Sequence, residues 1–203
     1  MWEGFAQRYG NNSLVVGADL RNELRKAGGV APTWGTGDLS TDWAAAATTC
    51  GNRILAFSPT WLIVVEGLNY ANDLKDAFLH PIVLDIPDRL VYSAHDYSWQ
   101  QPEVHNYVSF REYLDTMWGG LATASTSDAR KAVPLWVGEF GENTDSRWWG
   151  WILRYLKERK FGFSYWAVDG EQRLGQEESF GLLEMDYATV RDEWKLTDLQ
   201  SLQ

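Results

Sequence analysis

The stretch SLVVGADLRNELRK, residues 13–26, places an apolar run directly before a carboxamide and a carboxylate, Asn22 and Glu23. Apolar runs of this length that are rich in β-branched residues are typical of short buried strands. The same pattern recurs in four further stretches, so that five strands are expected. These stretches are WLIVVEGL (61–68), RLVYSAHDY (89–97), PLWVGEFG (134–141) and FGFSYWAV (161–168).

Helix-like segments lie between these runs. STDWAAAATTCGNRILAFSP (40–59) begins with Ser40 or Thr41 as the expected N-cap, and SFREYLDTMWGGLAT (109–123) and DSRWWGWILRYLKERK (145–160) have similar patterns. Apolar strands that alternate with helices predict an α/β protein whose parallel sheet is covered on both faces. No glycine-rich phosphate-binding motif follows the first strand, which weakens a nucleotide-binding layout.

Composition narrows the classes of partner. The chain has a net charge of −10 and a pI near 4.7 without a dense Lys/Arg cluster, so we expect neither a nucleic-acid partner nor binding to an anionic membrane. No apolar run approaches the roughly 18 residues of a membrane span. We expect an extracellular protein, although acidity, which is common in secreted microbial proteins, proves little by itself. Twelve Trp among 203 residues favour a carbohydrate partner as a set, because a sugar ring offers a flat face to an indole. The alternative is that most of them pack in the core, which is the expected state of any single Trp.

The single cysteine, Cys50, excludes an internal disulfide framework and a multi-cysteine zinc site. A buried free thiol is the expected state of this residue, and a disulfide to a segment outside this chain is the alternative.

Polar and aromatic residues stand at the carboxyl ends of several different strands. Groups distributed in this way predict a (β/α)8 TIM barrel, whose site is built at the carboxyl-terminal face. The chain offers five strands where such a barrel needs eight, and it begins in a helix-like segment, MWEGFAQRYG. We therefore expect residues 1–203 to supply about strands 4–8, with their helices, as the C-terminal part of a single barrel domain. An intact open sheet is the alternative.

The chain resembles glycoside hydrolase family 5, the cellulase family of retaining barrel glycosidases. The resemblance covers nearly the whole chain in the family's order, and its motifs together are specific where one alone would be weak. They are DLRNEL (19–24), WGTGDLSTDW (34–43), WLIVVEG (61–67), RLVYSAHDY (89–97), LWVGEFG (135–141) and SYWAVDG (164–170).

The resemblance implies that Glu23 is the general acid/base and Glu139 the nucleophile. Retaining hydrolysis needs two such carboxyl groups about 5 to 5.5 Å apart. Taken alone, Glu23 would be interpreted as an exposed loop carboxylate paired with Arg21 or Arg25.

The other implied site residues surround the reacting sugar. Asn22 would bond the hydroxyl next to the reacting carbon. His95 and Tyr97 are two apart on one strand and therefore point to the same face, where the Tyr would donate to the nucleophile and the His would contact substrate. Trp166 would be the stacking platform, followed by a non-proline cis peptide. Weaker platform candidates are Trp34, Trp43 and Trp99, and Glu66 would be either a supporting carboxylate or an ion-pair partner.

The implied activity is endo-acting, cellulase-type hydrolysis of β-1,4-glucan without metal or cofactor. The family's Arg and His from earlier strands have no counterpart in this sequence, so the expected partners are the polysaccharide or oligosaccharide and the missing N-terminal half of the barrel or another chain. The sequence also reads NEL where many relatives have NEP. Another β-glycan or glucoside as substrate, such as mannan or xyloglucan, a non-catalytic carbohydrate-binding fragment and an accidental likeness remain the alternatives.

Overall fold

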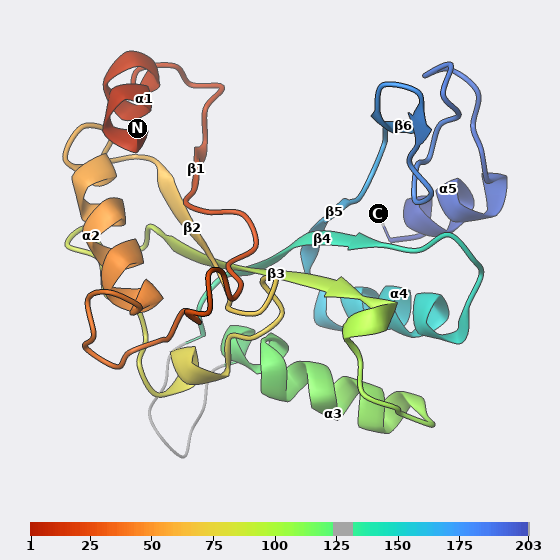
Figure 1. Ribbon diagram of the computed structural model, residues 1–203, viewed down its shortest axis with the longest axis horizontal. Helices are drawn as coiled ribbons and strands as arrows, with labels where there is room; N and C mark the ends of the chain where they lie inside the picture. The colour runs from red at the N-terminus through yellow and green to blue at the C-terminus, as the bar shows by residue number, and fades with distance from the viewer. Residues whose placement is uncertain (124–131, 203) are drawn as a thin grey trace. The chain divides into compact units, whose positions relative to one another are not determined.

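The computed structural model describes residues 1–123 and 132–202. Helices and strands alternate along most of the chain (Figure 1). The helices are α1 (Trp2–Tyr9), α2 (Trp43–Leu55), α3 (Tyr107–Met117), α4 (Arg147–Arg159) and α5 (Glu193–Gln200), with short 3-10 helices η1 (Lys75–Phe78), η2 (Ser98–Gln100) and η3 (Gly119–Ala122). The strands are β1 (Gly17–Asp19), β2 (Leu62–Glu66), β3 (Leu90–Tyr97), β4 (Leu135–Gly141), β5 (Gly162–Tyr165), β6 (Glu171–Arg173) and β7 (Gln176–Glu177).

Strands β1 to β5 form one sheet in their order along the chain. β1 pairs with β2 in parallel, with Gly17 opposite Leu62, and β2 pairs with β3 in parallel. Ile63 and Val65 of β2 are fully buried, and the intervening Val64 is half-buried. Burial on both faces is what an uninterrupted apolar run predicts for a parallel strand.

The chain forms two compact units, and each is described by itself. The first comprises Met1–Ala94 and Leu114–Trp136, and the second comprises His95–Tyr113 and Val137–Gln203. Among the residues that the structure describes, no helix has both the length and the apolar character of a membrane span.

In the first unit, helix α2 packs closely on β2. A Cβ added to Gly51 would lie 3.1 Å from Ile63 Cγ2 and 2.9 Å from Leu84 Cδ2, so glycine permits this approach. The helix is capped by Asp42, whose side chain accepts from the Ala45 N–H. The expected cap at Ser40 or Thr41 is therefore wrong by one or two residues, because three adjacent residues with capping side chains look alike in sequence.

In the second unit, aromatic side chains fill the space between β4, β5 and α4. The Phe140 ring lies within 6 Å of the Trp149, Phe163 and Tyr165 rings, at centroid distances of 5.9, 5.5 and 5.7 Å. Helix α4 begins at the N-cap Ser146, whose hydroxyl accepts from the Trp149 N–H.

The expected strands are present, although the first is shorter than the apolar run suggested. β1 contains three residues, and the preceding Leu14 and Val16 are 88% and 73% exposed. Apolar character alone does not make a strand, because only Gly17–Asp19 finds ladder partners on β2. The β6–β7 hairpin and helix α5 were not expected from the sequence.

Candidate active site

Glu23 lies in the loop that follows β1 in the first unit. Its backbone has a φ of +48°, in the left-handed region that residues other than glycine seldom adopt. Its N–H donates a 2.6 Å hydrogen bond to Oε2 of Glu66, at the end of β2, which is 1% exposed. Glu66 therefore fixes the backbone at Glu23. This contact favours a supporting carboxylate over an ion-pair partner, the two roles that the sequence allowed for Glu66.

The Glu23 side chain also has a basic neighbour. Arg25 Nη1 lies 4.0 Å from Glu23 Oε2, and the Arg25 side chain is 53% exposed. An exposed pair at this distance contributes little to stability. Asn22, next to Glu23, is exposed.

Glu139 lies on β4 in the second unit, and two side chains from the end of β3 meet its carboxylate. The Tyr97 hydroxyl donates to Glu139 Oε2 at 2.9 Å, and His95 Nδ1 lies 3.5 Å from the same oxygen. Both β3 side chains are buried, with exposures of 4% for Tyr97 and 2% for His95. The predicted common face of these two residues is confirmed. Such donors stabilise a carboxylate in its charged form and fix its orientation.

Most of the tryptophan excess is structural. Among the twelve tryptophans, Trp99 and Trp166 alone are more than a third exposed, at 62% and 45%. Both belong to the second unit, which also contains Glu139. Core packing, the expected state of any single Trp, therefore accounts for most of the set, and the sequence could not identify the exceptions because an indole in the core and one in a cleft look alike there.

Trp34 and Trp43 have no open ring face. Trp34 is 3% exposed and its Nε1 donates to the His80 carbonyl at 2.8 Å; Trp43 is 9% exposed and donates to the Glu66 carbonyl at 2.9 Å. Both rings belong to the core of the first unit. The expectation that Trp34 is a substrate platform is corrected for this reason.

Trp166 follows β5, and the peptide bond from Trp166 to Ala167 is cis, as the resemblance implied. Trp99 stacks on Tyr97 with ring centroids 4.3 Å apart. Phe180 completes this group, at 6.0 Å from the Tyr97 ring and 5.8 Å from the Trp99 ring. Nothing in the sequence around Phe180 signalled this contact, since it joins residues that are far apart in the chain.

Comparison with known proteins agrees with these observations. Residues 1–172 match the family model described as cellulase, glycosyl hydrolase family 5. An endoglucanase of Paenibacillus polymyxa is 37% identical over 188 residues, covering 83% of this chain and 46% of the relative. The major extracellular endoglucanase of Xanthomonas campestris pv. campestris is 29% identical over 219 residues, covering 97% of this chain and 42% of the relative.

Solved structures give the same result for the fold. The catalytic domain of the Xanthomonas campestris pv. campestris endoglucanase has a TM-score of 0.80 at 29% identity, with 99% of this chain and 60% of that chain covered. A cellotetraose complex of an endocellulase from Pyrococcus horikoshii has a TM-score of 0.80 at 26% identity, with coverages of 99% and 61%. These relatives are (β/α)8 barrels, so the predicted fold, part of such a barrel, is confirmed. The chain spans less than half the length of the two curated relatives.

Proposed function

Because the chain belongs to glycosyl hydrolase family 5, the cellulase family, we propose that it carries the catalytic residues of an endoglucanase that hydrolyses β-1,4-glucan with retention. Glu139 is the nucleophile and Glu23 the general acid/base in this proposal. The support comes from the family, from the endoglucanase relatives and from the positions of Glu139 near the end of β4 and of Glu23 in the loop after β1.

The observation that carries the proposal is the environment of Glu139. A nucleophile must be ionised and held in one orientation, and a hydroxyl donor provides both. Tyr97 supplies that donor at 2.9 Å, while the buried His95 imidazole lies 3.5 Å from the same oxygen. Two buried polar side chains of a neighbouring strand converge on this carboxylate, which is not expected for a carboxylate without a function.

The proposed reaction proceeds in two displacements. In the first, Glu139 attacks the anomeric carbon, the glycosidic bond breaks, and the Glu23 carboxylic acid gives its proton to the departing oxygen. In the second, the Glu23 carboxylate takes a proton from water, which attacks the same carbon and releases Glu139. The configuration at that carbon is retained, and the two carboxyl groups suffice without metal or cofactor.

Two further residues are assigned to the reacting sugar. Asn22, adjacent to the acid/base, would hydrogen-bond the neighbouring hydroxyl, a contact that strengthens in the oxocarbenium-like transition state. Trp166, with an exposed ring, would stack on the apolar face of the pyranose. β-1,4-Glucan is favoured as substrate because solved relatives include cellotetraose complexes. An extracellular location is proposed because one relative is an extracellular endoglucanase.

We also propose that the chain is the C-terminal part of one barrel domain and that strands 1–3 come from further polypeptide. Five strands in sequential order and a match to about 60% of each solved relative support this domain assignment. The complete enzyme is therefore the appropriate subject for the activity measurement.

The test is to replace Glu139 with Gln and to treat the unmodified enzyme with a 2-deoxy-2-fluoro glycoside that traps the glycosyl-enzyme. We expect Glu139→Gln to remain folded with no turnover of cellotetraose, and mass spectrometry to locate the label on Glu139. Glu142→Gln is a matched control, because Glu142 follows the same strand and is the more buried of the two carboxylates. Label on Glu23 would reverse the two roles, and an inverted product anomer by NMR would exclude double displacement.

A further inference from the structure

The contact between Tyr97 and Glu139 depends on where the Tyr97 ring lies. This ring is stacked on Trp99 at 4.3 Å and 17°, and Phe180 lies against both rings at 6.0 and 5.8 Å. Trp99 follows Tyr97 closely in sequence, whereas Phe180 arrives from the segment beyond the β6–β7 hairpin. Phe180 therefore supplies the long-range contact of this aromatic group.

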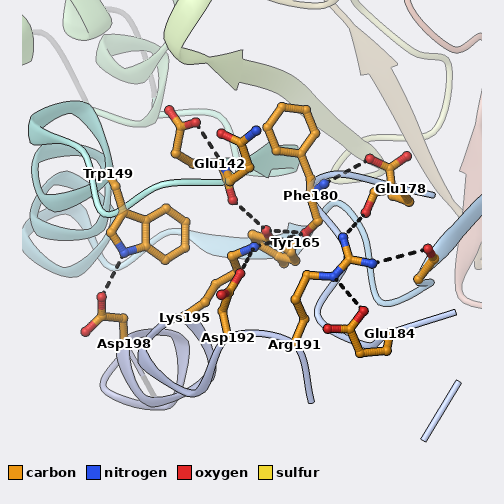
Figure 2. Close-up of polar contacts among 12 residues, drawn as sticks. Glu142, Trp149, Tyr165, Glu178, Phe180, Glu184, Arg191, Asp192, Lys195 and Asp198 are labelled. Carbon is orange, nitrogen blue, oxygen red and sulfur yellow. Dashed lines mark hydrogen bonds and ion pairs between the residues drawn. The ribbon is translucent and has the colours of Figure 1, made fainter. Parts of the chain in front are cut away.

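Both the carbonyl and the N–H of Phe180 are hydrogen-bonded (Figure 2). Its carbonyl accepts from the Tyr165 hydroxyl at 2.6 Å and from Lys195 Nζ at 3.4 Å. Its N–H donates to Oε1 of Glu178 at 3.1 Å, and the Glu178 carbonyl accepts from Arg191 at 2.5 Å. Three of these donors come from side chains, those of Tyr165, Lys195 and Arg191.

Lys195, on α5, is an unexpected residue to find in this place. Its side chain is 0% exposed, with Asp192 Oδ2 3.3 Å from its Nζ. Burial lowers the pKa of Lys195, since taking an ammonium group out of water disfavours its charged form. An apolar side chain of the same length would avoid this cost, so a packing role alone does not account for an amine. The amine adds an ion pair with Asp192 and a donor to the Phe180 carbonyl at 3.4 Å.

We propose that Lys195 and Tyr165 are positioning residues, which hold the Phe180 ring against Tyr97 and Trp99 and thereby keep the Tyr97 hydroxyl on Glu139. The inference rests on the proposed role of Glu139 and extends it to residues beyond position 172, where the family match ends. Lys195 acts through Phe180 and does not itself touch Glu139 in this arrangement.

The test uses two replacements of Lys195 and one control elsewhere on α5. Lys195→Met keeps most of the length and removes the donor, whereas Lys195→Gln keeps an N–H donor on a side chain one bond shorter. The control is Asp198→Asn, because Asp198 anchors α5 separately by accepting from Trp149 Nε1 at 2.8 Å. Figure 2 shows both sets of contacts made by α5, those of Lys195 and the hydrogen bond between Asp198 and Trp149.

The first readout does not require turnover. The ring resonances of Tyr97, labelled with carbon-13 and assigned with Tyr97→Phe, are expected to move in Lys195→Met, to return toward their original positions in Lys195→Gln, and to stay in place in Asp198→Asn. In a Phe180→Ala background, Lys195→Met should have no further effect on them, because the connecting residue is gone. Unmoved Tyr97 resonances in Lys195→Met, in a protein that is folded by circular dichroism, overturn the proposal.

The second readout is the kinetics of the complete enzyme on cellotetraose. A displaced Tyr97 should lower kcat by about 10-fold to 100-fold with KM little changed, since the interaction acts on the reacting group. Lys195→Gln, whose shorter side chain still carries an N–H donor, should recover part of this loss. If the Tyr97 resonances move in Lys195→Met but the complete enzyme without any replacement has no activity on cellotetraose, the proposed function is contradicted and the positioning contact is not. Equal kcat losses in Lys195→Met and Asp198→Asn would indicate general destabilisation of α5 and overturn the positioning role.

Discussion

The Tyr97 hydroxyl donates a 2.9 Å hydrogen bond to Glu139 Oε2, so that the end of β3 supplies a donor and β4 supplies its acceptor. The Tyr97 backbone is also fixed, because its N–H donates to the Gln100 side chain at 2.9 Å. The ring and the main chain of the donor are thus both restrained before any substrate arrives. Preorganisation of this kind is how a protein contributes to the chemistry of a carboxylate.

Tyr97→Phe removes the donor and keeps the ring. A hydrogen bond to a charged group contributes about 1.5 to 3 kcal/mol, so we expect kcat of the complete enzyme to fall about 10-fold to 100-fold. Tyr107→Phe is the matched control in the same unit, because the Tyr107 hydroxyl donates to the exposed Glu158 at 2.6 Å. Steady-state kinetics on cellotetraose provide the measurement. Similar losses in the two variants would argue against a specific role for Tyr97.

Glu66→Ala leaves the Glu23 N–H without its carboxylate acceptor. Loss of a partner for a partly buried donor costs about 1 to 3 kcal/mol, and we expect the free energy of unfolding to fall by that amount. Glu66→Gln should recover part of the loss, because its amide oxygen can accept the same bond. Urea unfolding measures the stability of each variant. If Glu66→Ala were as stable as the original chain, the 2.6 Å contact would not be holding the loop after β1.

Asp42 predicts a pH dependence of stability in the first unit. Burial raises the pKa of the Asp42 carboxyl. Hydrogen bonds from the N–H groups of Gly37, Ala45 and Gly35 lower it by more, so that the pKa lies below its ordinary value. A lowered pKa in the folded state stabilises the protein above the unfolded-state value, about 3.9. This stabilisation is lost as the pH falls through the lower folded-state pKa.

We therefore expect Asp42→Ala to lower the free energy of unfolding by about 0.5 to 2 kcal/mol near neutral pH. The difference from the original chain should shrink as the pH falls below about 4. Asp42→Asn, which keeps one acceptor oxygen, should lose less stability, and its difference from the original chain should likewise shrink at low pH, because only the original chain titrates at this position. Urea unfolding over a pH series checks all three chains, and a difference that grows toward low pH would contradict the assigned cause.

The exposed apolar residues before β1 predict association. Leu14 and Val16 are 88% and 73% exposed beside the first strand of the sheet, and such edges recruit other strands. The isolated chain is expected to be oligomeric by light scattering. Its mean molar mass should fall in Leu14→Lys and in Val16→Lys. Leu39→Lys is the control, since Leu39 is 87% exposed but lies outside any strand.

Adding polypeptide for strands 1–3 should also suppress association and restore a cooperative unfolding transition. A monodisperse, active monomer of the isolated chain would contradict the proposed domain assignment.

Local rules were sufficient for part of the site. The separation of His95 and Tyr97 by two residues determined that both side chains share one face of a strand, since side chains alternate along it. The apolar runs likewise determined the order of strands and helices, because their periodicity reflects burial of one element at a time. The family resemblance then singled out Glu23 and Glu139 from many other carboxylates.

Only the tertiary structure decided which residues support that site. Phe180 reaches Tyr97, and Lys195 reaches the Phe180 carbonyl, through contacts between segments far apart in sequence. The same holds for Trp34, whose burial depends on the elements packed around it, and for Leu14, which finds no strand partner. The sequence of a segment specifies its conformational preferences and its chemistry. Its neighbours are specified by the whole chain, because packing minimises the free energy of all segments together.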